Sequence, residues 1–366
     1  MRRKMEGMIS VSLCMIVRDE EKVLGRCLSG VRDLVDEIII VDTGSKDGTR
    51  EIAGKYTPKV YSFPWTDDFS EARNFSFSKA SMEYCMWMDA DDILSEKDRE
   101  AFLKLKHELS PDTDIVMMRY DTGFDENGNA VLGYYRERLI RNRRGFLWQG
   151  AVHEVIVPEG NIVYSDVAVS HKKIGAGNPD RNLNIYKKML SEGKCLNTRE
   201  LYYYARELYY HELYKQAAET LCRFLERPDA WMENKIEACQ VMAECYEKTG
   251  ERALSLRTLL KSLEYDVPRA EICCDIGKHF MEEGRYEIAE FWYKTALECK
   301  IDMKRGGFIL PDCYRYIPAI QLCVCCDKLG RYAEAKAYNE RAGKYKPDAP
   351  AVLYNREYFC GKNLNL

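Results

Sequence analysis

The apolar residues of this chain change their spacing near its middle, and that change limits the folds it can adopt. Up to about residue 170, short apolar runs alternate with stretches of helical spacing. Ile9–Val17 and Glu37–Val41 are dense in β-branched residues, as expected of strands buried on both faces. From about Asn182 onward, helical spacing continues without strand signals. We therefore predict an α/β domain over residues 1–175 and an all-α domain over residues 176–366.

The first half has the order of a sheet with crossover helices. Further strands are predicted over 59–63 and 84–88, and helices over 20–34, after Gly48-Thr49, over 71–81 and over 96–109. This βαβαβ order predicts a mostly parallel, Rossmann-like sheet with right-handed crossovers. Ligands of such sheets bind beyond the carboxyl ends of the strands, so the residues that follow each strand are the candidates for a binding or catalytic site.

Carboxylates stand at three of these strand ends. Asp89, Asp91 and Asp92 follow the strand 84–88, while Asp19 and Asp42 follow the first and second strands. Crowded acidic side chains repel one another, and a site that keeps them charged usually holds a hard cation such as Mg²⁺ or Mn²⁺. One or two carboxylates leave part of the metal's shell for phosphate oxygens. Two structural alternatives need no metal: the acidic residues could form a solvated turn, and Asp92 could cap the following helix.

The second half contains a repeated turn. Each copy has an aromatic residue or arginine two positions after the turn and a small residue five positions after it. The turns fall at Glu212, Gly250, Gly284 and Gly330, spaced by 38, 34 and 46 residues, and small residues precede them at Ala205, Ala243, Gly277 and Cys323. These features resemble tetratricopeptide repeats, helical hairpins with a period of about 34 residues. Residues 304–311 carry the loop signals for the one long spacing.

Composition narrows the partners and the compartment. The net charge of −4 shows no excess of basic residues that would attract a phosphate backbone, so nucleic acid is not expected as a partner. Of the 15 cysteines, neighbours such as Cys273-Cys274 fall within helical patterns, and no paired Cys-x-x-Cys set suggests zinc, which favours reduced, mostly buried thiols. The apolar run at Ile9–Val17 lacks a cleavage site, and no run approaches the ~18 apolar residues that span a bilayer. We predict a cytoplasmic protein.

The first half, roughly Ile9 to His171, resembles glycosyltransferase family 2, whose members are inverting enzymes with a GT-A fold. Six segments carry the resemblance in order: Ser12–Glu20, Glu37–Thr49, Trp65–Asn74, Asp89–Asp92, Arg138–Asn142 and Trp148–Glu154. The resemblance implies transfer of a sugar from a nucleoside-diphosphate sugar, with a UDP-sugar favoured, and a requirement for Mn²⁺ or Mg²⁺. Many members carry a second acid where this chain has Thr43, so the base and ribose contacts are less closely matched.

The resemblance also implies roles for individual residues. Asp19, Asp42, Arg73 and Asp89 would bind the donor, with Arg73 near its diphosphate, and Asp91, Asp89 and His171 would hold the metal. Glu154 is the candidate base, with His153 as the alternative base or an acceptor contact. Two structural alternatives stay open at this point: Arg73 paired with Asp67 or Asp68 on the surface, and His171 as a partly buried structural histidine.

The helical half bears on the acceptor. Family 2 enzymes with similar extensions include peptide S-glycosyltransferases of the glycocin type, whose extension mediates dimerisation. The resemblance therefore favours a peptide or protein acceptor and a homodimer, with a cell-envelope saccharide as the second choice. The aromatic run Leu201–Tyr204 could line a groove, or it could form core and exposed rim. Two rival functions are a catalytically inactive scaffold and a nucleotidyltransferase, but Cys14–Asp19 lacks the glycine-rich loop of the latter.

Overall fold

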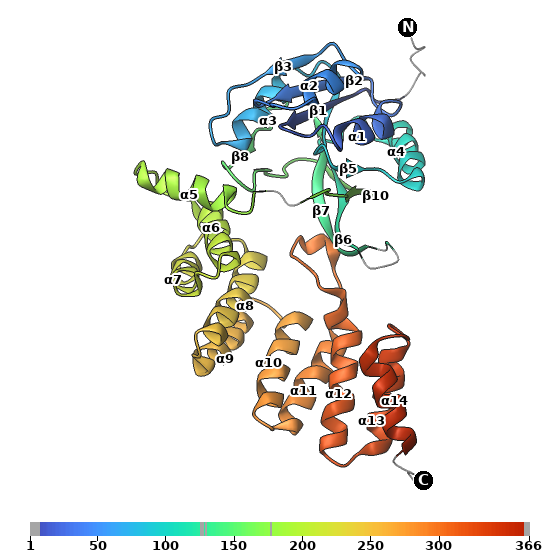
Figure 1. Cartoon of the computed structure of the whole chain (residues 1–366), viewed down its shortest axis with the longest axis vertical. Helices are drawn as coiled ribbons and strands as arrows, with labels where there is room; N and C mark the ends of the chain where they lie inside the picture. Colours follow the sequence, from blue (N-terminus) through green and yellow to red (C-terminus); the bar gives the residue numbers. More distant parts are fainter. Residues whose placement is uncertain (1–7, 125–127, 129, 176–177, 362–366) are drawn as a thin grey trace. The chain divides into compact units, whose positions relative to one another are not determined.

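The computed structural model describes residues 8–124, 128, 130–175 and 178–361, which divide into two compact units (Figure 1). The first unit spans Met1–Leu196 and the second Asn197–Leu366. Helix α5 (Arg181–Ser191) belongs to the first unit, so the division predicted between residues 175 and 176 lies on its N-terminal side. No helix within the described ranges is long and apolar enough to cross a membrane.

The first unit is built on an eight-stranded sheet with the order β3-β2-β1-β4-β7-β6-β10-β5. The strands β1, β2, β3 and β4 run parallel to one another, as predicted, and β10 runs parallel to β6. Their bounds are Val11–Val17 (β1), Glu37–Asp42 (β2), Val60–Ser62 (β3), Tyr84–Trp87 (β4), Asp92–Ile93 (β5), Ile115–Phe124 (β6), Ala130–Arg141 (β7) and Ile162–His171 (β10). The predicted GT-A-like α/β class is confirmed.

The sheet contains antiparallel pairings that the sequence did not predict. Strand β7 lies between β4 and β6 and is antiparallel to both, because β6 and β7 form a long hairpin. The short strand β5 closes the order and pairs antiparallel with β10, which places His171 directly opposite Asp92. A separate two-stranded sheet joins β8 (Trp148–Gln149) to β9 (Val155–Ile156).

The helices of the first unit follow their sequence signals closely. They are α1 (Leu24–Val31), α2 (Thr49–Gly54), α3 (Phe69–Ser78) and α4 (Glu96–Glu108). Helix α3 begins at Phe69 because the Asp68 carboxylate accepts a hydrogen bond from the Glu71 amide at 3.0 Å. Helix α4 is capped by Ser95, whose hydroxyl accepts from the Asp98 amide. The alternative that Asp92 caps this helix is therefore wrong.

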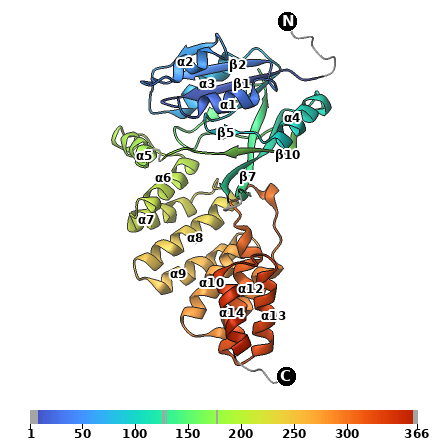
Figure 2. The same cartoon turned by 45° about the vertical axis from the view of Figure 1, so that its right-hand side comes forward.

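The second unit consists of helical hairpins stacked along the chain (Figure 2). The helices are α6 (Thr198–Tyr210), α7 (Tyr214–Leu225), α8 (Met232–Lys248), α9 (Arg252–Lys261), α10 (Ala270–Glu282), α11 (Tyr286–Glu298), α12 (Tyr316–Lys328), α13 (Tyr332–Gly343) and α14 (Pro350–Gly361). All four predicted turn residues have positive φ between paired helices: 59° at Glu212, 83° at Gly250, 73° at Gly284 and 75° at Gly330. The predicted tetratricopeptide-like repeats are confirmed.

Details of the second unit agree with its sequence signals. The long repeat spacing corresponds to a loop between α11 and α12 that contains the 3₁₀ turns Met303–Arg305 and Pro311–Tyr314. In the aromatic run, Tyr202 is fully buried, Tyr203 and Tyr204 are half-buried, and the nearby Tyr210 is exposed, so the run forms core and rim. Most of the cysteines are buried free thiols, as predicted.

Candidate active site

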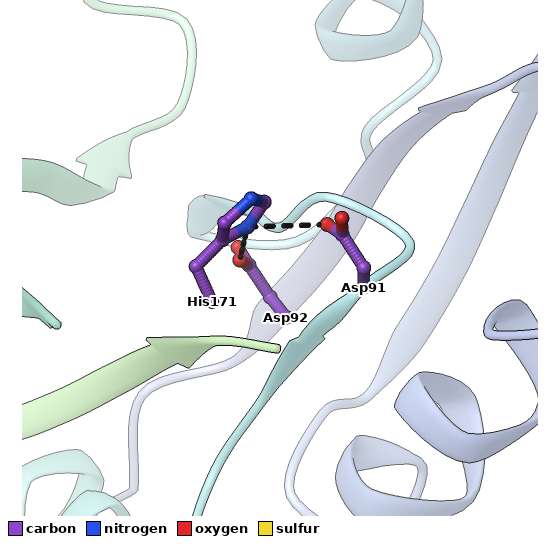
Figure 3. Close-up of side chains that lie close together, drawn as sticks. All are labelled: Asp91, Asp92 and His171. Carbon is purple, nitrogen blue, oxygen red and sulfur yellow. Dashed lines mark hydrogen bonds and ion pairs between the residues drawn. The ribbon is translucent and has the colours of Figure 1, made fainter. Parts of the chain in front are cut away.

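A cluster of two carboxylates and one imidazole lies at the edge of the sheet where β5 meets β10 (Figure 3). His171 Nδ1 lies 3.2 Å from Asp91 Oδ1 and 3.2 Å from Asp92 Oδ1. Each of the three residues offers a ligand atom within 4.8 Å of the other two. The pairing of β5 with β10 brings these residues together although about 80 positions separate them in the chain.

Asp92 is the structural member of this cluster. Its side chain is fully buried, and its Oδ2 accepts from Arg138 Nη1 at 3.1 Å and from the Asp89 amide at 3.0 Å. The Tyr120 hydroxyl donates to Asp92 Oδ1 at 3.1 Å and lies 2.9 Å from His171 Nδ1. Asp92 therefore fixes the positions of both His171 and the Asp89 backbone, whereas the sequence suggested only a role as the cap of the following helix.

The donor atoms of this cluster suit a hard divalent cation. Asp91 and His171 keep 15% and 29% of their side-chain surface exposed, so a ligand from solvent can reach them. Hydrogen bonds to Asp91 and Asp92 raise the pKa of His171 to about 10, and a metal bound there would replace that proton. Oxygen and imidazole nitrogen are donors that Mn²⁺ accepts, and Mg²⁺ accepts the oxygens. The residues present therefore fit the expected metal.

Asp89, the third predicted metal ligand, lies outside this cluster. Its Oδ1 accepts from Arg73 Nη2 at 2.8 Å. Burial raises the pKa of the Asp89 carboxyl, but the charges of Arg73 and Arg138 outweigh that effect and bring the pKa below its usual value. Asp89 is thus an ionised acid beside the cluster and is partly exposed.

Arg73 connects Asp89 with Glu154. Its Nε donates to Glu154 Oε1 at 2.6 Å, and only 5% of the arginine is exposed. The guanidinium lies 4.7 Å from the centre of the Trp87 ring and 5.0 Å from that of Trp148. The alternative that Arg73 forms a surface pair with Asp67 or Asp68 is wrong, because Asp67 pairs with Lys188 and Asp68 caps α3. His153 precedes the glutamate with a positive φ of 53°.

Asp19 and Asp42 lie at the ends of β1 and β2. Val17 is the register partner of Asp42, so the two parallel strands end side by side. Asp42 is buried and accepts from the Ser45 amide at 3.2 Å, while Asp19 Oδ1 accepts from the Lys46 amide at 2.7 Å. Both carboxylates hold the loop that follows β2 in place and stand at the carboxyl edge where a nucleotide binds in sheets of this kind.

Three residues near the cluster were given no role from the sequence. Burial and the charges of Asp91 and Asp89 raise the pKa of Glu20 to about 7. Its place directly after Asp19 at a strand end was a signal that could have identified it. Tyr120 and the buried Arg138 belong to the β6–β7 hairpin, and their contacts with Asp92 follow from a strand order that periodicity does not reveal.

Comparisons with known proteins agree with this arrangement. The sequence model of Glycosyl transferase family 2 matches residues 12–160. A TPR repeat-containing protein of Synechococcus elongatus is 39% identical over 151 residues, 41% of this chain and 36% of that protein. The lipopolysaccharide core biosynthesis glycosyltransferase LpsC of Rhizobium meliloti is 31% identical over 42% of this chain and 59% of its own length. The prophage-derived glycosyltransferase SunS of Bacillus subtilis is 27% identical over 58% of this chain and 52% of its own.

These matches span between about a third and three fifths of the lengths of the relatives. The family match covers the strands from β1 to β9, including Arg73, Glu154 and the acidic segment 89–92, and ends before β10 and His171. The helices from α6 onward form the tetratricopeptide-like repeats described above. Residues 12–160 are therefore a domain of glycosyl transferase family 2.

Proposed function

We propose that this protein transfers a sugar, with inversion at the anomeric carbon, from a nucleoside-diphosphate sugar to an acceptor. The observation that carries the proposal is the link between two ion pairs in a family 2 domain. Arg73 pairs with Glu154 and also donates to Asp89, two residues before Asp91, and Asp91 forms an accessible pair with His171. A UDP-sugar is the favoured donor. Asp19, Asp42 and Asp89 would contact its nucleoside and ribose from the strand ends.

The chemistry needs stabilisation of a leaving diphosphate and removal of one proton. Mn²⁺ or Mg²⁺ held by Asp91 and His171 would neutralise charge that develops on the diphosphate. Asp92, buried behind them, holds the histidine in place through its own contacts with Tyr120 and Arg138. Asp89 is held beside this cluster by its backbone amide, which donates to Asp92 at 3.0 Å.

Glu154 is the group best placed to act as the base. As the acceptor oxygen or sulfur attacks the anomeric carbon, the bond to the diphosphate breaks and the acceptor's proton passes to Glu154. A single displacement of this kind inverts the anomeric centre and needs no covalent enzyme intermediate. His153, the preceding residue, would contact the acceptor.

The acceptor is proposed to be a peptide or protein side chain, with a cell-envelope saccharide as the alternative. The alternative is supported by the similarity to LpsC, which is named for lipopolysaccharide core biosynthesis. The helical repeats supply a second unit that could hold an extended acceptor or a second copy of the chain.

Donor binding with metal tests the proposal against the rival of an inactive scaffold. We expect Mn²⁺ together with a UDP-sugar to raise the melting temperature, more than GDP- or dTDP-sugars do, and Asp91→Asn to abolish the shift. Asp112→Asn, at an exposed position outside the site, is the matched control and should keep it. A melting curve that no metal–donor pair moves would support the scaffold, and a preference for GDP-sugars would overturn the UDP assignment.

A further inference from the structure

We propose that Arg73 is a positioning residue that holds the carboxylate of Glu154 at the acceptor side of the site, and that it does not bind the donor diphosphate. This inference rests on the proposed glycosyl transfer, in which Glu154 is the base. It differs from the phosphate-binding role that the family resemblance implied for Arg73, and it follows from what the guanidinium touches.

The guanidinium is already engaged on its edges and on its faces. Nε and Nη2 donate to Glu154 and Asp89 at 2.6 and 2.8 Å, so two of its nitrogens face carboxylates. Trp87 and Trp148 lie within 5.0 Å of its centre, and their rings are perpendicular to each other at 5.2 Å. A group bound in this way is well ordered, and turning it toward a diphosphate would break at least one charge-assisted hydrogen bond.

Helix α3 also fixes the segment that carries Glu154. The Asn74 side-chain amide donates to the Trp148 carbonyl at 3.0 Å and accepts from the Trp148 amide at 2.9 Å. At the start of the helix, the Phe69 amide donates to the Ala151 carbonyl at 2.9 Å. The backbone of residues 148–151 is thus hydrogen-bonded to α3 at both ends. Arg73 extends this docking to the Glu154 side chain.

The charges support a permanent pairing. Burial lowers the pKa of Arg73, but the carboxylates of Asp89 and Glu154 outweigh burial and raise it, so the guanidinium stays protonated. Its planar fork can bind two separate acids at fixed angles, whereas a lysine offers a single ammonium on a flexible stem. The arginine therefore sets the separation between an acid on the donor side and the candidate base.

A double-mutant cycle between Arg73 and Glu154 tests this role. The rate is measured as hydrolysis of a UDP-sugar by wild type and by each variant, followed by the release of UDP. Binding of UDP in the presence of Mn²⁺ is measured by calorimetry. Displacing a catalytic group by about 1 Å costs on the order of 100-fold in rate. We therefore expect Arg73→Gln to lower kcat about 100-fold, with an unchanged Kd for UDP and Mn²⁺. In the Glu154→Gln background the same change should cost little more, because Arg73 acts through Glu154.

The outcomes separate the two proposals. Independent, multiplying losses in the cycle, together with weaker UDP binding, would show that Arg73 contacts the diphosphate and would overturn this inference. A wild type that neither binds UDP with Mn²⁺ nor hydrolyses any nucleotide sugar would instead overturn the proposed function. Arg73→Lys keeps the charge and carries the test if the glutamine variant does not fold. It should also lose kcat and keep its Kd, because one ammonium cannot replace the fork.

Discussion

Arg138 and Asp92 form an ion pair with no exposed surface on either side chain. Each partner compensates a charge that would otherwise be buried alone. The Arg138 guanidinium also lies against the rings of Trp87 and Tyr120, at 3.7 and 4.3 Å from their centres. At the residue scale, the candidate metal cluster thus depends on a cation that never reaches solvent.

Removing one partner of this pair should be costly. We expect Arg138→Met to lower the free energy of unfolding of the first unit by about 3–5 kcal/mol, because Asp92 is left as an uncompensated buried charge. Urea unfolding measures the change. Arg138→Met combined with Asp92→Asn is the matched control and should recover part of the loss. A single-variant loss below about 1 kcal/mol, the range of an exposed pair, would contradict the described burial.

Glu37 gives a prediction that depends on pH. Burial raises the pKa of its carboxyl, but hydrogen bonds from Lys59, Ser12 and Ser81 outweigh burial and lower it to about 2. The folded-state pKa is depressed, so the stabilisation is complete above the unfolded-state value and is lost as the pH falls toward 2. We expect Glu37→Gln to be less stable than wild type by about 3 kcal/mol near neutral pH. The difference should shrink below about pH 5, and a constant difference across that range would contradict the assignment.

At the scale of elements, the second unit depends on close approach between paired helices. A Cβ placed on Gly277 in α10 would lie 2.9 Å from the ring of Tyr293 in α11, and that ring is buried. Sequence periodicity located this position as one of the small residues that precede each turn. Its partner Tyr293 was not predicted from the sequence.

Gly277→Ala should destabilise the second unit by about 1–3 kcal/mol, because the helices must separate to admit the methyl group. Gly30→Ala in α1 is the matched control, since its Cβ would meet nothing within 4 Å and alanine is the better helix former. Thermal unfolding followed by circular dichroism separates the two. Equal melting temperatures for Gly277→Ala and wild type would mean that α10 and α11 are not packed this closely.

Elements with local sequence signals were predictable, and pairings between distant strands were not. Strands β1, β2 and β4 and helices α3 and α4 were predictable because β-branched runs, helical spacing and capping residues are local signals. The β6–β7 hairpin was not, because its antiparallel pairing with β4 depends on contacts between distant segments. That pairing brings Arg138 against Trp87 and Asp92, and the pairing of β10 with β5 completes the cluster with His171.

For the whole molecule, the change of apolar spacing was enough to predict an α/β unit followed by helical repeats. Proximity at the site was predictable only in part. Parallel strands that end at one edge implied that Asp19, Asp42 and the acidic segment lie along the same edge. The hydrogen bond from Arg73 to Glu154 was not predicted, because no sequence motif indicates which residue pairs with either of them.

Inverting glycosyl transfer is the central claim at this scale, and the anomeric form of the released sugar tests it most directly. Proton NMR would follow a UDP-α-hexose with Mg²⁺, because paramagnetic Mn²⁺ broadens the signals. We predict that wild type consumes the donor and releases the β-hexose first, before mutarotation, and that Asp91→Asn consumes none. Release of the α-hexose first would contradict the inverting mechanism, and no consumption of any nucleotide sugar would contradict glycosyl transfer itself.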